Sequence, residues 1–288
     1  MQSYTLKWQG HCIELGERTC VMGILNTTPD SFSDGGRFLN REDALAQGEE
    51  LVAAGADILD IGGESTRPFS KGVSTEEEIR RVLPVIETLA ARMPVPISID
   101  TTKAAVAKRA VDAGAAIIND VSALRQDPAM ASVAATCGVP VVLMHMLGTP
   151  RTMQVDPVYN DLFGEIGNFL ATAIKKAVES GIDRKLLIAD PGIGFGKTVA
   201  HNLLLVKHMD VFKDLNVPML IGPSRKAFIR TILRGDSDRE VTPDLPEVAV
   251  GTQATVAAAV LSGAHIVRVH DVAATRATVA LADALRRA

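Results

Sequence analysis

Polar side chains stand directly after short apolar segments along this chain. Asp100 follows Ile97–Ile99 and Asp190 follows Leu186–Ala189. A carboxylate accepts two parallel hydrogen bonds from the donor edge of a flat, nitrogen-rich ring, as it does from guanidinium. Arginine and histidine at equivalent positions are suited to phosphate. The predicted ligand is therefore an aromatic heterocycle that carries phosphate. The polar groups that follow eight apolar segments are Asn26, residues 64–67, Asp100, Asn119, His145, Asp190, Ser224 to Lys226, and Arg268 with His270.

The apolar segments themselves predict the fold. Each resembles a strand buried on both faces of a parallel sheet, and several follow a Gly-Ala pair that would end a helix. Eight strands that alternate with helices predict an α/β fold of the (β/α)8 (TIM) barrel type, with a doubly wound open sheet as the alternative. The carboxyl ends of barrel strands meet at one mouth, where active sites lie. The predicted strands centre on Met22–Leu25, Ile58–Ile61, Ile97–Ile99, Ile117–Asn119, Val141–Met144, Leu186–Ala189, Met219–Ile221 and Ile266–Val269.

Other local signals complete the prediction. Tyr4–Leu15 predicts a β-hairpin that closes the N-terminal face of the barrel. No linker or break in composition divides the chain, so we expect a single domain over residues 1–288. Asn40 is a candidate N-cap, and Ser74 begins a candidate capping box. Pro84 should kink its helix or end it early.

Composition and charge exclude several classes of partner. The net charge of −4 provides no general attraction to nucleic acid or an anionic membrane. The three cysteines are widely spaced and include no Cys-x-x-Cys pair, which argues against both a zinc site and a disulfide framework. Neither a signal peptide nor a membrane span is predicted, and the expected location is the cytoplasm.

A glycine-rich segment at Pro191–Thr198 invites comparison with a phosphate-binding P-loop. That pattern requires glycine where Pro191 stands, and Lys197 occupies the third glycine position of the dinucleotide-binding pattern. We therefore expect a loop whose backbone lets a ligand approach closely, because glycine has no Cβ, and no ATP site.

Five segments resemble signatures of the dihydropteroate synthases. The two most specific are the segments 22–36, MGILNTTPDSFSDGG, and 60–68, DIGGESTRP. The other three are DPGIGFGK at 190–197, SRK at 224–226 and RVHD at 268–271. The resemblance extends from about Val21 to Val272. It implies a transferase that uses Mg²⁺ to condense 6-hydroxymethyl-7,8-dihydropterin pyrophosphate with p-aminobenzoate, giving 7,8-dihydropteroate for folate synthesis.

The resemblance also implies a role for each matching residue. Asp100, Lys226 and Arg67 would be catalytic. The pterin would be bound by Asp100, Asn119, Met144, Asp190, Phe195 and Lys226. Asn26, Thr66, Arg268 and His270 would hold pyrophosphate, with Asn26 also contacting the metal. p-Aminobenzoate, and sulfonamides that imitate it, would lie among Phe32, Thr66, Arg67, Pro68 and Ser224.

The chain departs from the family pattern at two positions, and two alternative functions remain open. Phe69 stands where the family usually has glycine, beside the p-aminobenzoate pocket, and Leu147 stands where glutamine is common. A methyltetrahydrofolate:corrinoid methyltransferase would share the barrel but would not be expected to carry the segment 29–36. A non-catalytic pterin-binding paralogue would be expected to lose Asn26 or Arg67.

Two further expectations concern assembly and motion. Val248–Ala264 has no charged residue, although an outer barrel helix normally shows water a polar face, and this predicts a homodimer. The segments Thr27–Gly36 and Ser65–Ser74 are expected to be mobile without ligand and ordered with it.

Overall fold

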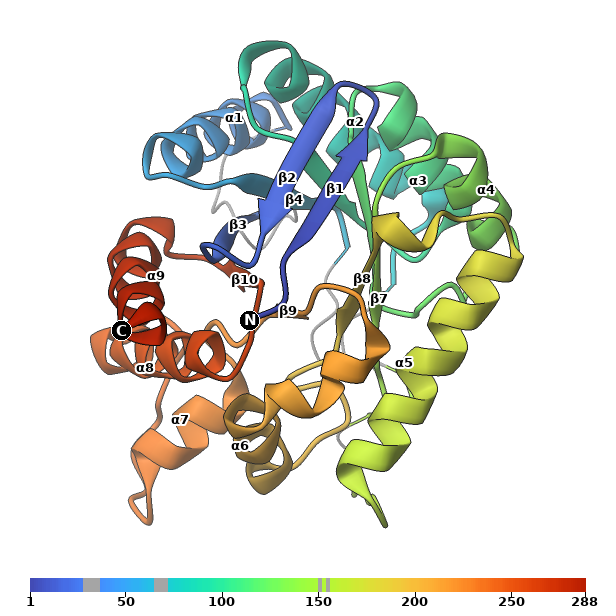
Figure 1. The fold of residues 1–288 in the computed structure, drawn as a ribbon. Coiled ribbons are helices and arrows are strands. Elements are labelled where there is room, and N and C mark those ends of the chain that lie inside the picture. Colours follow the sequence, from blue (N-terminus) through green and yellow to red (C-terminus); the bar gives the residue numbers. More distant parts are fainter. Residues whose placement is uncertain (28–36, 65–71, 150–151, 154–155) are drawn as a thin grey trace.

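The computed structural model describes residues 1–27, 37–64, 72–149, 152–153 and 156–288. Its centre is an eight-stranded parallel sheet that curves into a nearly closed barrel, as the sequence predicted (Figure 1). The strands neighbour one another in the order β8-β7-β6-β5-β4-β3-β10-β9. Their bounds are β3 Cys20–Asn26, β4 Ile58–Gly62, β5 Ile97–Asp100, β6 Ile117–Asp120, β7 Val141–Met144, β8 Leu187–Asp190, β9 Leu220–Ile221 and β10 Ile266–Val269.

The seam between β8 and β9 is the weakest part of the barrel. β9 has only two residues, and the seam is bridged by a single parallel pair, Ala189 with Met219. The Ala189 amide donates to the Pro218 carbonyl at 2.9 Å. The barrel is therefore joined here by little backbone pairing.

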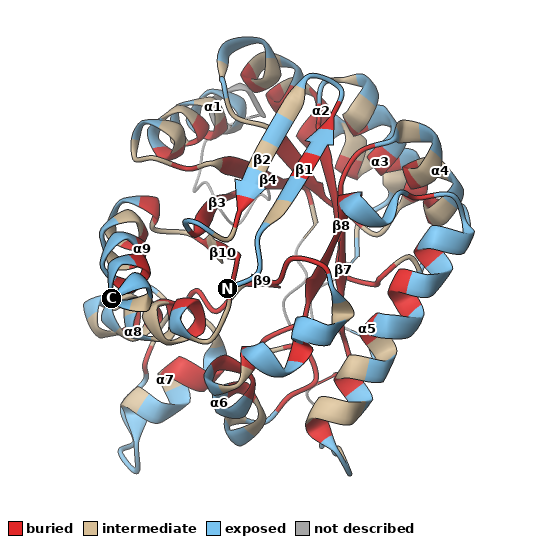
Figure 2. Ribbon diagram, in the orientation of Figure 1, coloured by how far each residue is buried: buried red, intermediate tan, exposed pale blue. Residues whose placement is uncertain are grey.

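Helices surround the barrel and bury their apolar faces against it (Figure 2). The strands carry Ile, Val and Leu that are almost fully buried, and burial of each such side chain stabilises the fold by about 1.5–3 kcal/mol. Within the described parts of the chain, no helix has the length and apolar character that crossing a membrane requires. The helices are α1 Arg37–Ala53, α2 Thr75–Arg92, α3 Ala104–Asp112, α4 Met130–Cys137, α5 Leu162–Glu179, α6 Val199–Lys207, α7 Ala227–Arg234, α8 Pro246–Leu261 and α9 Val272–Arg287, with short 3₁₀ segments at Arg184–Leu186 and Met209–Leu215.

The predicted N-terminal hairpin consists of β1 Tyr4–Trp8 and β2 His11–Leu15. It lies across the end of the barrel nearest the viewer in Figure 1. Gln9 Nε2 donates to the Cys137 carbonyl at 2.6 Å, just before β7 begins. Trp8 of β1 and Leu15 of β2 are buried. The hairpin therefore covers the N-terminal end and leaves the carboxyl ends of the strands for the site.

Three local predictions require correction. Asn40 is not an N-cap, because α1 begins at Arg37. Of the two outcomes predicted at Pro84, an early end to the helix is excluded, since α2 continues to Arg92, whereas a kink stays a prediction. Ser74 does cap α2 by accepting from the Glu77 amide, but the Glu77 carboxylate binds Arg80 and Arg81 and does not complete a capping box.

Candidate functional site

The register of the sheet aligns polar side chains at the carboxyl ends of the strands. Asn26 pairs with Gly62, Gly62 pairs with Asp100, and Asp100 pairs with Asn119. On the next strands, Met144 pairs with Asp190. Neighbouring strands thus bring residues from distant parts of the chain to similar levels around one mouth.

An arginine between two carboxylates occupies the centre of this mouth. Arg268 Nε donates to Asp60 Oδ2 at 2.6 Å, and a terminal nitrogen donates to Asp100 Oδ2 at 2.8 Å. Asn119 Nδ2 donates to the same Asp60 oxygen at 3.1 Å. The Oδ1 atoms of Asp60 and Asp100 are buried and have no hydrogen-bond partner among the described residues. The mouth therefore contains buried acceptors that a ligand with N–H groups could satisfy.

Burial and the two neighbouring charged groups do not all shift the pKa of the Asp100 carboxyl in the same direction. Burial raises the pKa of the Asp100 carboxyl, the Arg268 guanidinium lowers it, and the neighbouring Asp60 carboxylate raises it again. The short bonds to Arg268 favour the ionised form. Asp60 is a residue whose role the sequence reasoning missed, although a carboxylate between Leu59 and Ile61 in an apolar strand was a signal.

Asp190 provides a second buried carboxylate on the other side of the mouth. Its Oδ1 accepts from the Gly192 amide at 2.7 Å. Burial raises the pKa of Asp190 to about 6, against the Gly192 bond and the charges of Lys226 and Lys197, which lower it. Asp190 can therefore accept hydrogen bonds as an anion at neutral pH.

The glycine-rich loop after Asp190 packs tightly against the loop after β7. Gly192 has φ +73°, and a Cβ there would lie 1.9 Å from the His145 carbonyl oxygen. Gly196 has φ +67°, and a Cβ there would lie 2.7 Å from Leu147. These glycines are required by the close approach of two loops as well as by backbone conformation.

An apolar wall adjoins Asp190. Met144 and Phe195 belong to a small buried cluster with Val121, Met146 and Met153. Lys226 Nζ lies 4.0 Å from the centroid of the Phe195 ring, a cation–π geometry. This wall could pack against the face of a flat ring whose edge reaches the carboxylates.

Ser224 and His270 contact each other at the carboxyl ends of two neighbouring strands. Ser224 Oγ lies 3.0 Å from His270 Nδ1 and accepts from the His270 amide at 3.3 Å. Ser224 is buried and follows β9, whereas His270 follows β10. The structure thus brings together two residues to which the sequence reasoning gave different ligands, p-aminobenzoate and pyrophosphate.

Asn26 offers one oxygen at the end of β3. A Cβ on Gly62 would lie 3.9 Å from Asn26 Oδ1 and 3.6 Å from Asp100 Cβ, so the two side chains flank Gly62. Among the described residues, no group of three or more histidine, cysteine, aspartate or glutamate side chains could hold a metal. One hard oxygen nevertheless fits Mg²⁺, which keeps several waters and is commonly bound through few protein oxygens plus substrate phosphates.

Four predicted site residues lie outside the described residues: Phe32, Thr66, Arg67 and Pro68. Phe69 lies there as well, and so does most of the two segments predicted to order with ligand. At the boundary of the second segment, Lys103 forms ion pairs with Glu64 and with the fully buried Glu78. This network was not anticipated, because nothing in the spacing of the three residues links them.

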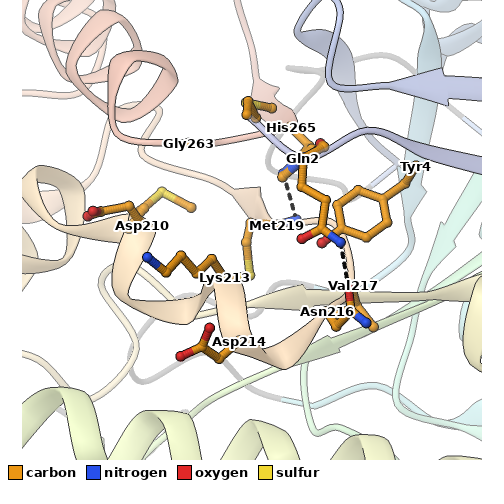
Figure 3. Close-up of a pocket in the computed structure, with 12 residues that line it drawn as sticks. Gln2, Tyr4, Asp210, Lys213, Asp214, Asn216, Val217, Met219, Gly263 and His265 are labelled. Atoms are coloured by element: carbon orange, nitrogen blue, oxygen red, sulfur yellow. Dashed lines mark hydrogen bonds between the residues drawn. The ribbon is translucent and has the colours of Figure 1, made fainter.

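A pocket of about 530 Å³ lies at the opposite, N-terminal end of the barrel (Figure 3). Some of the polar groups that line it bond to one another. His265 Nδ1 accepts from the Met219 amide at 3.1 Å, and Gln2 Nε2 donates to Asn216 Oδ1. Burial lowers the pKa of His265 to about 4, which keeps the ring neutral. We interpret these contacts as an anchor for the N-terminal segment.

Comparison with known proteins decides the family. The model of the pterin binding enzyme family matches residues 22–270. A dihydropteroate synthase from Synechocystis is 47% identical over 94% of this chain and 92% of its own length. The chain belongs to the dihydropteroate synthases.

Solved dihydropteroate synthases share the fold almost throughout. The enzyme of Xanthomonas albilineans with 4-aminobenzoic acid superimposes with a TM-score of 0.90 at 44% identity, covering 100% of both chains. The Yersinia pestis enzyme in complex with a sulfonamide drug gives a TM-score of 0.90 at 43% identity, over 98% of this chain and 99% of that one. As a dihydropteroate synthase the chain is a transferase, and the predicted family and fold are confirmed.

Proposed function

We propose that this dihydropteroate synthase condenses 6-hydroxymethyl-7,8-dihydropterin pyrophosphate with p-aminobenzoate, releasing 7,8-dihydropteroate and pyrophosphate. The observation that carries the proposal is the pair of buried carboxylates, Asp100 and Asp190, with Arg268 at the same mouth. Acids suit the donor edge of the pterin, and the arginine suits the phosphates.

The pterin would lie between the acids and the apolar wall. Asp190 and Asp100 would accept from its N–H groups, and Asn119 can both donate and accept. Met144 and Phe195 would pack on the ring face. Lys226, over the Phe195 ring, would donate to a ring acceptor. Ligand donors would then satisfy the buried Asp100 oxygen that has no partner among the described residues.

The pyrophosphate would lie on Arg268, His270 and Asn26. A guanidinium has five N–H groups, so Arg268 can keep its bonds to Asp60 and Asp100 and still donate to phosphate oxygens. Thr66 would add a contact. Mg²⁺, held by Asn26 together with water and phosphate oxygens, would stabilise the charge of the leaving group.

Departure of pyrophosphate leaves a positive charge spread over the electron-rich pterin. We expect the Asp100 carboxylate to stabilise this cation as it forms. The aniline nitrogen of p-aminobenzoate would then attack the cation, form the C–N bond and lose a proton to the departing pyrophosphate or to water, with no covalent bond to the enzyme. Phe32, Thr66, Arg67, Pro68 and Ser224 would hold p-aminobenzoate for this attack, and sulfonamides would compete there. The protein contributes mainly position and electrostatics.

The assay that tests this function supplies both substrates with Mg²⁺ and measures dihydropteroate by chromatography. We expect product with Mg²⁺ and a large loss of turnover when EDTA is added, restored by excess Mg²⁺. Binding of pterin without product would favour the non-catalytic paralogue. Methyl transfer from methyltetrahydrofolate to a corrinoid protein would favour the other alternative. Turnover that is insensitive to EDTA would contradict the proposed role of the metal.

We also propose that the enzyme is a homodimer that pairs through α8 and α9, which lie side by side (Figure 1). α8 presents Val250 at 70% exposure and Leu261 at 50%, and α9 presents Leu281 at 70%. Exposed aliphatic side chains on adjacent helices are typical of a subunit interface.

Light scattering at micromolar concentration should therefore give the mass of two chains. Leu281→Glu should shift the mass toward one chain, because a buried unpaired charge opposes association. Val178→Glu, on the exposed side of α5 at 41% exposure, is the matched control and should leave the mass unchanged. A monomeric wild-type protein would exclude the dimer.

We propose a cytoplasmic location because the cysteines do not form disulfides. Cys12, Cys20 and Cys137 are all free thiols, and Cys12 is exposed. Free exposed thiols are typical of a reducing compartment.

A further inference from the structure

Lys197 is a buried lysine behind the proposed pterin site to which no role has been given. Only 3% of the residue is exposed. Its Nζ lies 3.0 Å from His145 Nδ1 and donates to the Phe195 carbonyl at 3.0 Å. An amine is costly to bury, so its position at the end of a glycine-rich loop calls for an explanation.

The contacts of Lys197 connect the loop to residues that would touch the pterin. Lys197 holds the Phe195 carbonyl, and the Phe195 ring lies under Lys226 Nζ. The Phe195 amide in turn donates to the Gly192 carbonyl at 3.1 Å. Gly192 holds Asp190 through its own amide. The side chain of Lys197 therefore braces the loop that orients Asp190 and Phe195.

His145 provides a neutral acceptor for this brace. Burial, together with the charges of Lys197 and Arg125, lowers the pKa of His145 to about 3, so the ring is uncharged. Nδ1 can accept from Lys197 when the proton is on Nε2. The ring is also held edge-on against Phe169, with centroids 4.8 Å apart. His145 is thus a fixed anchor for the lysine.

We propose that Lys197 is a positioning residue of the pterin site, which sets the place of the Phe195 ring and the charge balance of Asp190 without touching the substrate. The proposal rests on the function proposed above. It differs from a purely structural role because it predicts an electrostatic effect on ligand binding.

The charges around Lys197 give the sign of that effect. Burial lowers the pKa of Lys197 to about 7, with Asp190 raising it and Lys226 lowering it. His201, on α6, also has its pKa lowered, by burial and by Lys197. At pH 6 the lysine is mostly protonated and helps to keep Asp190 ionised. Removing that charge should raise the pKa of Asp190, so pterin binding should weaken at a higher pH than in the wild type.

The test measures pterin pyrophosphate affinity between pH 5 and 8 by calorimetry for Lys197→Met and for Lys207→Met. Lys207 is exposed on α6, and its variant should behave as the wild type. Lys197→Met should bind about tenfold more weakly at pH 8, the effect expected from leaving buried acceptors unpaired. The acid limb of its profile, which is the range where pterin affinity falls with decreasing pH, should lie at higher pH than in the wild type. KM should rise for the pterin and stay unchanged for p-aminobenzoate.

His145→Phe separates the two effects, because it keeps ring packing and the lysine charge but removes the acceptor. It should weaken binding without moving the acid limb. Unchanged affinity in either folded variant, or equal rises in KM for both substrates, would overturn the proposal. If Lys197→Met does not fold, unchanged affinity in His145→Phe still overturns it, and weaker affinity supports it. A wild-type protein that binds no pterin would instead refute the proposed function.

Discussion

Asp190→Asn should lower the affinity for pterin pyrophosphate about 10- to 100-fold, the equivalent of leaving a buried donor unpaired at about 1–3 kcal/mol. The asparagine oxygen can keep the bond from the Gly192 amide, now 2.7 Å long. Its amide group would then face the donor edge of the pterin, so two donors would oppose each other. Affinity should fall to a similar extent for the pterin alcohol and for its pyrophosphate ester.

The pH dependence provides a second readout. The pKa of Asp190 is raised to about 6, so wild-type affinity should be fully present above that pH and fall as the pH drops through it. Asparagine does not titrate, and this limb should disappear in the variant. Because burial of the ionised carboxylate destabilises the free protein, the thermal midpoint at pH 8 should not fall in the variant.

Calorimetry on the wild type, Asp190→Asn and Asp112→Asn checks this prediction. Asp112 forms an exposed pair with Lys108, and its variant should bind normally, because such pairs contribute little. Unchanged affinity in Asp190→Asn would remove Asp190 from the pterin site.

Arg268→Ala should affect both stability and binding. The structure places its guanidinium between Asp60, which is fully buried, and Asp100, which is 9% exposed. Removing one partner of a buried ion pair costs about 3–5 kcal/mol of unfolding free energy. Affinity for the pyrophosphate ester should also fall far more than affinity for the pterin alcohol, because the charge-assisted contact is to phosphate.

The loss of unfolding free energy in Arg268→Ala should increase as the pH rises. Without Arg268 the pKa of Asp100, already raised by burial, should rise further. A carboxyl group whose pKa is raised in the folded protein stabilises the fold at low pH. This contribution is lost as the pH rises through the raised pKa. The difference in unfolding free energy between the wild type and the variant should therefore be larger at pH 8 than at pH 6.

Urea unfolding at the two pH values and calorimetry with both ligands measure these effects. Arg92→Ala is the matched control, since Arg92 pairs with Glu49 at an exposed site and should cost no more than about 1 kcal/mol. Arg268→Lys should recover part of the stability. Equal losses for the ester and the alcohol would count against a pyrophosphate contact.

Much of the fold could be predicted from local patterns. Apolar segments such as Ile58–Ile61, each followed by polar residues, indicated the eight strands and the mouth of the barrel. The reason is that a parallel strand buried on both faces is a nearly continuous apolar segment. Local helix signals were less reliable. The N-cap at Asn40 was wrong, and Pro84 did not end its helix, because tertiary packing supports a helix beyond what propensity alone allows.

The sequence by itself determined the barrel, the family and many of the described polar residues that follow its strands. Only the tertiary structure decided how those residues pair. Arg268 and Asp100 were assigned to different ligands, yet they are bonded 2.8 Å apart, with Asp60 as a third partner. Lys197 was set aside with its glycine-rich loop, yet it braces the site through His145. Spacing along a chain shows which side chains reach a mouth. The side chain that neutralises each buried charge there depends on distances across the barrel, between residues as far apart in sequence as Asp60 and Arg268.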